Sequence, residues 1–162
     1  MKEICENTCC FFGHREIVET DELRRWVRNT IENLIVNEGI DTFLFGSKSR
    51  FDSLCYELVS EAKKRHPHIK RIYVRAEYPV ISDEFRSYLL KEYEDTFFPE
   101  SVKGANRLAY IKRNREMVNR SRFCIVYYDE AVSPRMRKSG TEMAIKYARN
   151  KGKIIYRFSN DK

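Results

Sequence analysis

The stretch NTCCFFGHR, residues 7–15, decides how the rest of the chain is interpreted. Its apolar part is too short for a helix and stops at Gly13, which favours a buried strand followed by a turn. Residues that follow a strand of a parallel α/β sheet line the crevice where ligands bind. Gly13 permits close backbone approach, and Arg15 offers a fork of donors suited to phosphate. The segment alone is equally consistent with a first strand and an ordinary exposed loop.

Further apolar runs of strand length follow, and segments with helical periodicity separate them. The first helix is expected to begin near Thr20, a candidate N-cap, and to end near Gly39. The other expected strands are residues 42–46, 70–75, 122–129 and 153–157. The other expected helices are residues 51–65, 82–93, 106–119 and 139–150. Residues 95–104 show no clear period and are expected to form a long loop, of the kind that often serves as a lid or binding loop.

This alternation of strands and helices predicts the α/β class. We expect a single domain over residues 1–162, because that length is typical of one domain. The architecture predicted is a Rossmann-like three-layer sandwich with a mainly parallel five-stranded sheet, covered by helices on both faces.

The composition limits the classes of function. The formal charge is +7, from 31 basic and 24 acidic residues, which permits an anionic partner without identifying one. Basic clusters lie at residues 63–65, 113–122 and 135–138, but none of the common nucleic-acid-binding motifs is present, so a solvated basic surface is the favoured interpretation.

Membrane and secretory signals are missing from the sequence. No apolar stretch approaches the roughly 20 residues of a membrane span, and residues 1–6 lack an apolar signal-peptide core. We therefore expect a cytoplasmic protein without a membrane partner. Five cysteines, an odd number with no C-x-x-C pair, predict free thiols, and we predict neither a metal site nor a cofactor.

Three segments at expected strand ends carry the candidate site. They are Gly13-His14-Arg15, Gly46-Ser47-Lys48-Ser49 and Ser139-Gly140-Thr141. Glycine and hydroxyl residues at helix N-termini present backbone N–H groups and a positive dipole end to an anion. Thr141 is alternatively a helix cap with a purely structural role. The chain has neither the Walker signature nor the G-x-G-x-x-G fingerprint, which argues against a P-loop NTPase and an ordinary dinucleotide dehydrogenase.

Taken together, the segments resemble the YpsA-like branch of the SLOG superfamily, the Rossmann-like group that includes the DprA (Smf) and LOG proteins. The matching pieces, which span roughly residues 7–157, are residues 8–15; Gly46 through Phe51-Asp52 to Glu57; Arg113-Asn114 with Met117-Val118; and Ser139-Gly140-Thr141 with Tyr147-Ala148. The resemblance implies a nucleotide or nucleotide-derived ligand, bound over the carboxyl ends of the strands.

The expected ligand-binding residues follow from these pieces. They are Gly13, His14, Arg15, Gly46, Ser47, Lys48, Asp52, Glu57, Arg113, Asn114, Ser139, Gly140 and Thr141. Two roles for Asp52 are left open, capping its helix or binding a ribose hydroxyl. The resemblance also implies a homodimer that pairs through helices beside the site.

The LOG branch comprises phosphoribohydrolases, which split a nucleoside monophosphate into free base and ribose phosphate. Arg113 matches the catalytic arginine of that branch, but the glutamate expected three residues after Thr141 is Ala144. Glu142 lies about 200° away around the helix from that position and is a poor substitute. Ser47, Arg50 and Ser139 also stand where the family has glycine, and their Cβ atoms restrict backbone approach to phosphate.

Three hypotheses follow. The leading one is a binding module that senses a nucleotide-like ligand or regulates in response to it. The second is a hydrolase with Arg113 and Glu142 as its catalytic residues, helped by Asp52 or Glu57. The third and least favoured, binding of single-stranded nucleic acid, is suggested by the positive charge and the DprA relationship.

Overall fold

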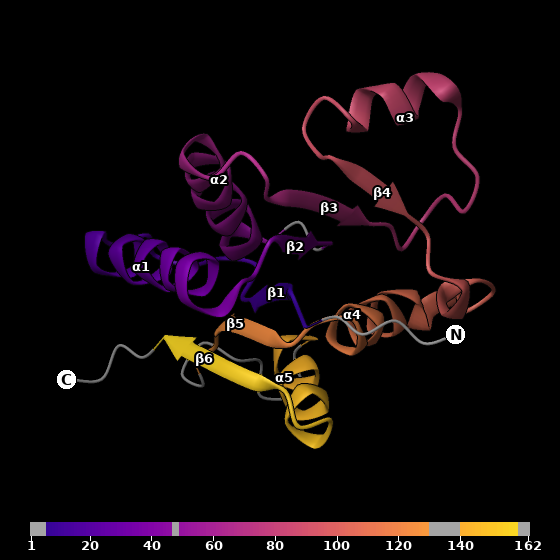
Figure 1. The fold of residues 1–162 in the computed structure, drawn as a ribbon. Helices are drawn as coiled ribbons and strands as arrows, with labels where there is room; N and C mark the ends of the chain where they lie inside the picture. Colours follow the sequence, from indigo (N-terminus) through magenta and orange to yellow (C-terminus); the bar gives the residue numbers. More distant parts are fainter. Residues whose placement is uncertain (1–5, 47–48, 130–139, 159–162) are drawn as a thin grey trace.

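The structure is a computed structural model and describes residues 6–46, 49–129 and 140–158. These residues form one sheet of six strands in the order β4-β3-β2-β1-β5-β6 (Figure 1), and every strand pair is parallel. The strands are β1 Thr8–Gly13, β2 Thr42–Phe45, β3 Lys70–Val74, β4 Asp95–Phe97, β5 Phe123–Tyr127 and β6 Ile154–Phe158. The helices are α1 Asp21–Glu38, α2 Arg50–Arg65, α3 Asp83–Leu89, α4 Ala109–Asn119 and α5 Gly140–Asn150, with 3₁₀ turns η1 Glu100–Val102 and η2 Asn106–Leu108.

Helices cover both faces of the sheet, and α1 and α2 lie on the face opposite α4 and α5 (Figure 1). Strand β1 supplies both layers of the core because its side chains alternate between the two faces. Cys9 and Phe11 pack under α1 and α2, whereas Cys10 and Phe12 pack under α4 and α5. The predicted α/β class is confirmed, and a Rossmann-like sandwich fits this arrangement.

The predicted strand number was wrong, because the described sheet has six strands rather than five. Strand β4 lies inside residues 95–104, which were expected to be a loop, and it pairs with β3 from Ile72↔Asp95 to Val74↔Phe97. A three-residue edge strand that begins with an aspartate has no measurable alternation. Its pairing depends on β3, more than 20 residues earlier, so local periodicity does not reveal it.

The helix ends follow the expected capping chemistry in α1. The Thr20 hydroxyl accepts a hydrogen bond from the Leu23 N–H at 3.0 Å, and Gly39 ends the helix with a φ of 72°. Helix α3 is shorter than the expected residues 82–93, and α4 follows the 3₁₀ turn η2 instead of continuing from residue 106. Within the described parts of the chain, no helix has the length and apolar character needed to cross a membrane.

The direction of the connections reverses at the centre of the sheet. The chain runs from β1 through β2 and β3 to β4 on one side, then crosses back to β5 and β6 on the other side of β1. In open α/β sheets, ligands bind outside the carboxyl ends of the strands at such a reversal. The carboxyl ends of β1, β2 and β5 are therefore the place to look for a site.

Candidate functional site

Gly13 ends β1 where the first turn of α2 packs against the strand. A Cβ atom at Gly13 would lie 2.4 Å from the ring of Phe51, which is fully buried. The missing side chain thus admits Phe51 and lets α2 begin close above the sheet. Close approach of a protein side chain explains this glycine, and its predicted contact with a ligand stays a prediction.

His14 joins the ends of β1 and β5. Its ring is buried, and Nε2 accepts a hydrogen bond from the Asp129 N–H at 2.8 Å. The ring centroid also lies 5.2 Å from that of Tyr128 and 5.8 Å from that of Tyr127. These contacts hold the two strand ends together at the point where the connections reverse.

Arg113 is the centre of the site. It rises from α4, is only 3 % exposed, and lies over the ends of β2 and β3. Its Nη1 donates to the Gly46 carbonyl at 2.7 Å and to the Val74 carbonyl at 3.3 Å, and its Nε donates to Asn114 Oδ1 at 3.0 Å. Main-chain carbonyls at the ends of β2 and β3 thus hold the guanidinium of Arg113 in place.

Gly46 has no side chain for a reason specific to this arrangement. A Cβ atom there would lie 2.8 Å from Arg113 Cδ and 2.9 Å from both Arg113 Nε and Met117 Sδ. The arginine and the methionine of α4 therefore need a glycine at the end of β2.

Asp52 approaches the same point from α2, on the opposite face of the sheet. Its side chain is 6 % exposed, and Oδ1 is the only buried side-chain N or O atom in the described residues without a hydrogen-bond partner. Burial raises the pKa of Asp52 well above its ordinary value, while Arg113 and a backbone hydrogen bond from Gly46 act in the opposite direction. Burial also lowers the pKa of Arg113, and the charge of Asp52 is among the groups that oppose this.

The structure tests one of the two roles left open for Asp52, that of capping its helix. The N-cap of α2 is Ser49, whose hydroxyl accepts from the Asp52 N–H at 3.0 Å. The capping role for Asp52 was therefore wrong, because the side chain that caps is three residues earlier. Binding of a ribose hydroxyl stays a prediction.

Two predicted residues are available on the surface of this edge. Arg15 is exposed, and its backbone carbonyl accepts from the Arg50 N–H at 2.8 Å. Gly140 begins α5, and a Cβ atom there would have no neighbour within 4 Å. The following residue, Thr141, is buried. An exposed arginine and an uncrowded helix N-terminus are features that suit an anion.

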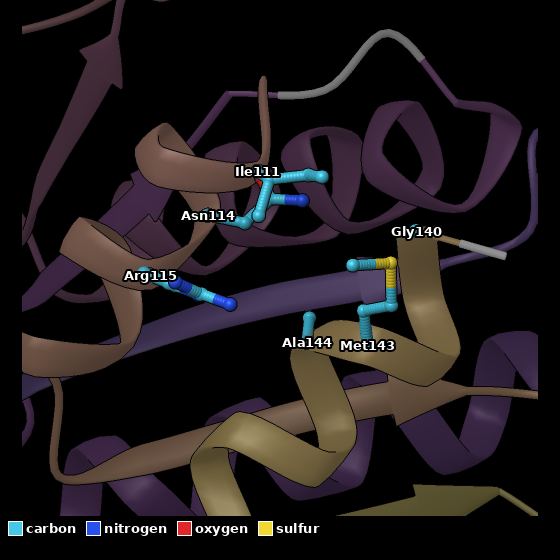
Figure 2. A pocket seen from close by; sticks show the side chains of 6 residues that line it. All are labelled: Ile111, Asn114, Arg115, Gly140, Met143 and Ala144. Atoms are coloured by element: carbon cyan, nitrogen blue, oxygen red, sulfur yellow. The ribbon is translucent and has the colours of Figure 1, made fainter. Parts of the chain in front are cut away.

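A small cavity separates α4 from the first turns of α5 (Figure 2). Its lining is Ile111, Asn114, Arg115, Gly140, Met143 and Ala144. Its volume of about 10 Å³ is that of roughly one water molecule, so in this state it accommodates no larger group. Ala144, at the position where the resemblance calls for a glutamate, contributes only a methyl group to this wall.

The two predicted glutamates make contacts of their own. Glu57 on α2 pairs with Arg24 of α1 at 2.9 Å, and this hydrogen bond lowers the pKa of Glu57. The carboxylate of Glu142 accepts from the Tyr128 hydroxyl at 3.4 Å and lies 3.8 Å from Lys146 Nζ. The geometry thus brings Gly46, Asp52, Arg113 and Asn114 together, and it places Glu57 in a separate contact between α1 and α2.

Three predicted ligand-binding residues, Ser47, Lys48 and Ser139, lie outside the described residues. Among the described residues, no group of three or more His, Cys, Asp or Glu could hold a metal ion. Four described cysteines, Cys9, Cys10, Cys55 and Cys124, are buried and free.

Sequence reasoning missed a second feature beside Asp52. A cleft of about 380 Å³ lies between α2, β3 and α3. Its lining is Asp52, Ser53, Tyr56, Tyr73, Phe85, Tyr88, Leu89, Glu92 and Tyr93. The signal available in the sequence was the density of aromatic residues in and after the helix expected at residues 82–93, which is uncommon on a solvated helix.

The fold and the edge define a Rossmann-like α/β protein with a buried arginine and a buried carboxylate at the reversal of its sheet. Comparison with protein-family models gives no match, and neither does comparison with curated protein sequences.

Proposed function

We propose that this chain is a cytoplasmic SLOG-type protein of the YpsA-like branch that binds a nucleotide or nucleotide-derived ligand over the carboxyl ends of β1, β2 and β5. Its role would be that of a sensor or regulator, and it would act as a homodimer paired through helices beside the site. The observation that carries the proposal is the buried Arg113 and the buried, incompletely bonded Asp52, which meet at Gly46.

Burying these two groups costs free energy that a purely structural role does not require. Removing the charge of Arg113 from water costs several kcal/mol, and a buried Asp52 oxygen without a hydrogen-bond partner costs about 1–3 kcal/mol more. Buried groups with displaced pKa values gather at functional sites for that reason. The position of the pair, at the reversal of a parallel sheet, is where ligands of open α/β folds bind.

Phosphate binding is assigned to the surface of the same edge. Exposed Arg15 and the N-terminus of α5 at Gly140 supply positive potential, whereas Arg113 is already bonded to main-chain carbonyls. In this proposal Arg113 stabilises the main chain at the ends of β2 and β3. The anionic group of the ligand binds at the surface, beside Arg15 and Gly140.

The hydrolase hypothesis is less favoured. Its mechanism needs a carboxylate at position 144, and Ala144 supplies none, while Glu142 is engaged with Tyr128 and Lys146. Among the carboxylates that act on the charge of Arg113, Asp52 has the largest effect, but burial favours the neutral form of Asp52.

The test is a thermal-shift screen with nucleoside mono-, di- and triphosphates, NAD derivatives and ADP-ribose. A ligand that binds only the folded chain stabilises it by about 2.7 kcal/mol at 100 times its Kd. We expect at least one compound to do so. Failure of every compound would refute the proposal.

A matched pair of variants then places the site. Arg15→Ala and Arg149→Ala each remove one exposed positive charge, but Arg149 lies in the last turn of α5, which leads into the start of β6 at the opposite edge of the sheet. We expect Arg15→Ala to weaken binding about tenfold, the value of one charge-assisted contact, and Arg149→Ala to leave it unchanged. Equal effects would show that only net charge matters. Release of free base from a nucleoside monophosphate would instead establish the hydrolase.

A further inference from the structure

The cleft between α2, β3 and α3, here called the tyrosine cleft, is large enough for a small molecule. Its volume of about 380 Å³ falls within the roughly 300–1,000 Å³ typical of ligand pockets. It lies on the side of the sheet covered by α2, opposite the small cavity between α4 and α5. The proposed function shares Asp52 with this cleft but makes no use of its aromatic walls, so the cleft can be tested separately from that function.

Aromatic rings from three elements form its walls. Tyr73 of β3 stacks on Tyr93 with ring centroids 5.3 Å apart, and Tyr56 of α2 lies 5.2 Å from Tyr93. On α3, Phe85 and Tyr88 stack at 6.2 Å, and Tyr88 is 61 % exposed. Exposed aromatic rings over a cleft cost free energy in water, which favours a ligand that covers them.

The lining of the cleft includes acidic residues but no basic ones. Asp52 and Glu92 contribute carboxyl groups, and no lysine, arginine or histidine is among the lining residues, although the whole chain carries a charge of +7. Two arginines close to this lining are already bonded elsewhere. Arg71 lies over the ring of Tyr56 at 5.5 Å, and its guanidinium is bonded to both carboxylate oxygens of Glu94. Arg113, whose charge acts on Asp52, is bonded to main-chain carbonyls.

Asp52 forms a buried polar part of the cleft wall. The side chain is more than nine-tenths buried, lines the cleft, and keeps Oδ1 without a hydrogen-bond partner. Because burial favours the neutral form of Asp52, this residue adds an uncharged polar part to the wall, and Glu92 carries the negative charge of the cleft.

We propose that the tyrosine cleft binds a small organic cation, a protonated or quaternary amine. Cations are attracted to the faces of aromatic rings, and tyrosine cages are a recurrent way of binding alkylated ammonium groups. The carboxylate of Glu92 balances the charge of such a ligand, whereas it repels phosphate and other anions. A neutral planar ring would use the aromatic walls but would gain nothing from Glu92.

The test is isothermal titration calorimetry with choline and with 3,3-dimethylbutan-1-ol, which has the same shape with a carbon in place of the charged nitrogen. We expect saturable binding of choline and roughly 5- to 30-fold weaker binding of the alcohol, because a desolvated cation–π contact is worth about 1–2 kcal/mol. Equal affinities, or no binding of choline, would overturn the proposal. Binding of adenosine but not choline would also overturn it and would identify a pocket for a neutral base.

Variants on exposed walls locate the ligand without threatening the fold. Tyr88→Leu keeps an apolar side chain but removes a ring, and Glu92→Gln removes a charge; both residues are exposed. Each change should weaken choline binding about threefold to tenfold. Tyr110→Leu, at an exposed tyrosine of α4 outside the cleft, is the control and should have no effect. If Tyr88→Leu behaves like that control, choline binds elsewhere. Because Tyr88→Leu and Glu92→Gln leave Arg15 and Arg113 intact, nucleotide binding by these two variants reports separately on the strand-end site.

Discussion

At the scale of single residues, Asp52 makes the sharpest prediction about stability and pH. Burial raises the pKa of Asp52 in the folded chain above that in the unfolded chain. Between these two pKa values the folded chain keeps a proton that the unfolded chain has lost, so the free energy of unfolding falls as pH rises. Asp52→Asn abolishes that fall. We expect the variant to match the natural chain below about pH 4 and to exceed its stability increasingly towards neutral pH.

Urea denaturation from pH 3.5 to 8 measures this difference. Glu57→Gln is the control of opposite sign, because Arg24 lowers the pKa of Glu57 and that stabilisation is lost as pH falls. Its effect should be small, since the pair is largely exposed. A loss of stability in Asp52→Asn at neutral pH would mean that attraction to Arg113 outweighs the cost of burying the carboxylate.

Glycines in the sequence indicated positions where another group approaches the main chain closely, but they did not identify that group. Gly13 and Gly46 were singled out because glycine admits a near neighbour, and the structure supplies Phe51 and Arg113 as those neighbours. The absence of a Cβ atom carries no information about whether a ligand or a side chain fills the space. The partners of Arg113 lie 67 and 39 residues away along the chain, so only the fold reveals that they are carbonyls.

At the scale of elements, five strands and the order of the helices could be predicted because their apolar periodicity is local. Strand β4 could not, since its attachment depends on side-chain hydrogen bonds between distant residues. The Thr96 hydroxyl donates to the Tyr73 carbonyl at 2.8 Å and accepts from Arg75 Nη1 at 3.1 Å. The tyrosine cleft escaped prediction for a related reason, because its walls come from three elements that the sequence does not place side by side.

Thr96→Val tests whether those hydrogen bonds fasten β4 to the sheet. Valine keeps the shape of the buried threonine but leaves the Tyr73 carbonyl and Arg75 each with one partner fewer. We expect a loss of about 1–2 kcal/mol and faster hydrogen exchange at the amides of β4. Thr42→Val, which removes one hydrogen bond to the neighbouring Asp41, should cost less. Equal costs for the two variants would contradict the role assigned to Thr96.

At the scale of the whole molecule, the arrangement of charge decides how the basic composition is interpreted. A net charge of +7 is compatible with nucleic-acid binding, but several arginines of the sequence clusters are already engaged with other groups of the chain. Arg113 is buried under the strand ends, while Arg65, Arg120 and Arg122 each make an ion pair with a glutamate. The third cluster, residues 135–138, lies outside the described residues.

We therefore expect single-stranded DNA to bind only with the affinity of non-specific protein–DNA complexes, a Kd of about 10⁻⁴–10⁻⁶ M near physiological salt. Fluorescence anisotropy of a labelled 20-nucleotide strand, titrated at several salt concentrations, measures both the affinity and the number of phosphates neutralised. Because the paired arginines must release their glutamates to bind phosphate, the dependence of log K on log salt should be shallow. Nanomolar affinity with a steep salt dependence would favour nucleic-acid binding over the nucleotide sensor, and it would direct attention to residues 135–138.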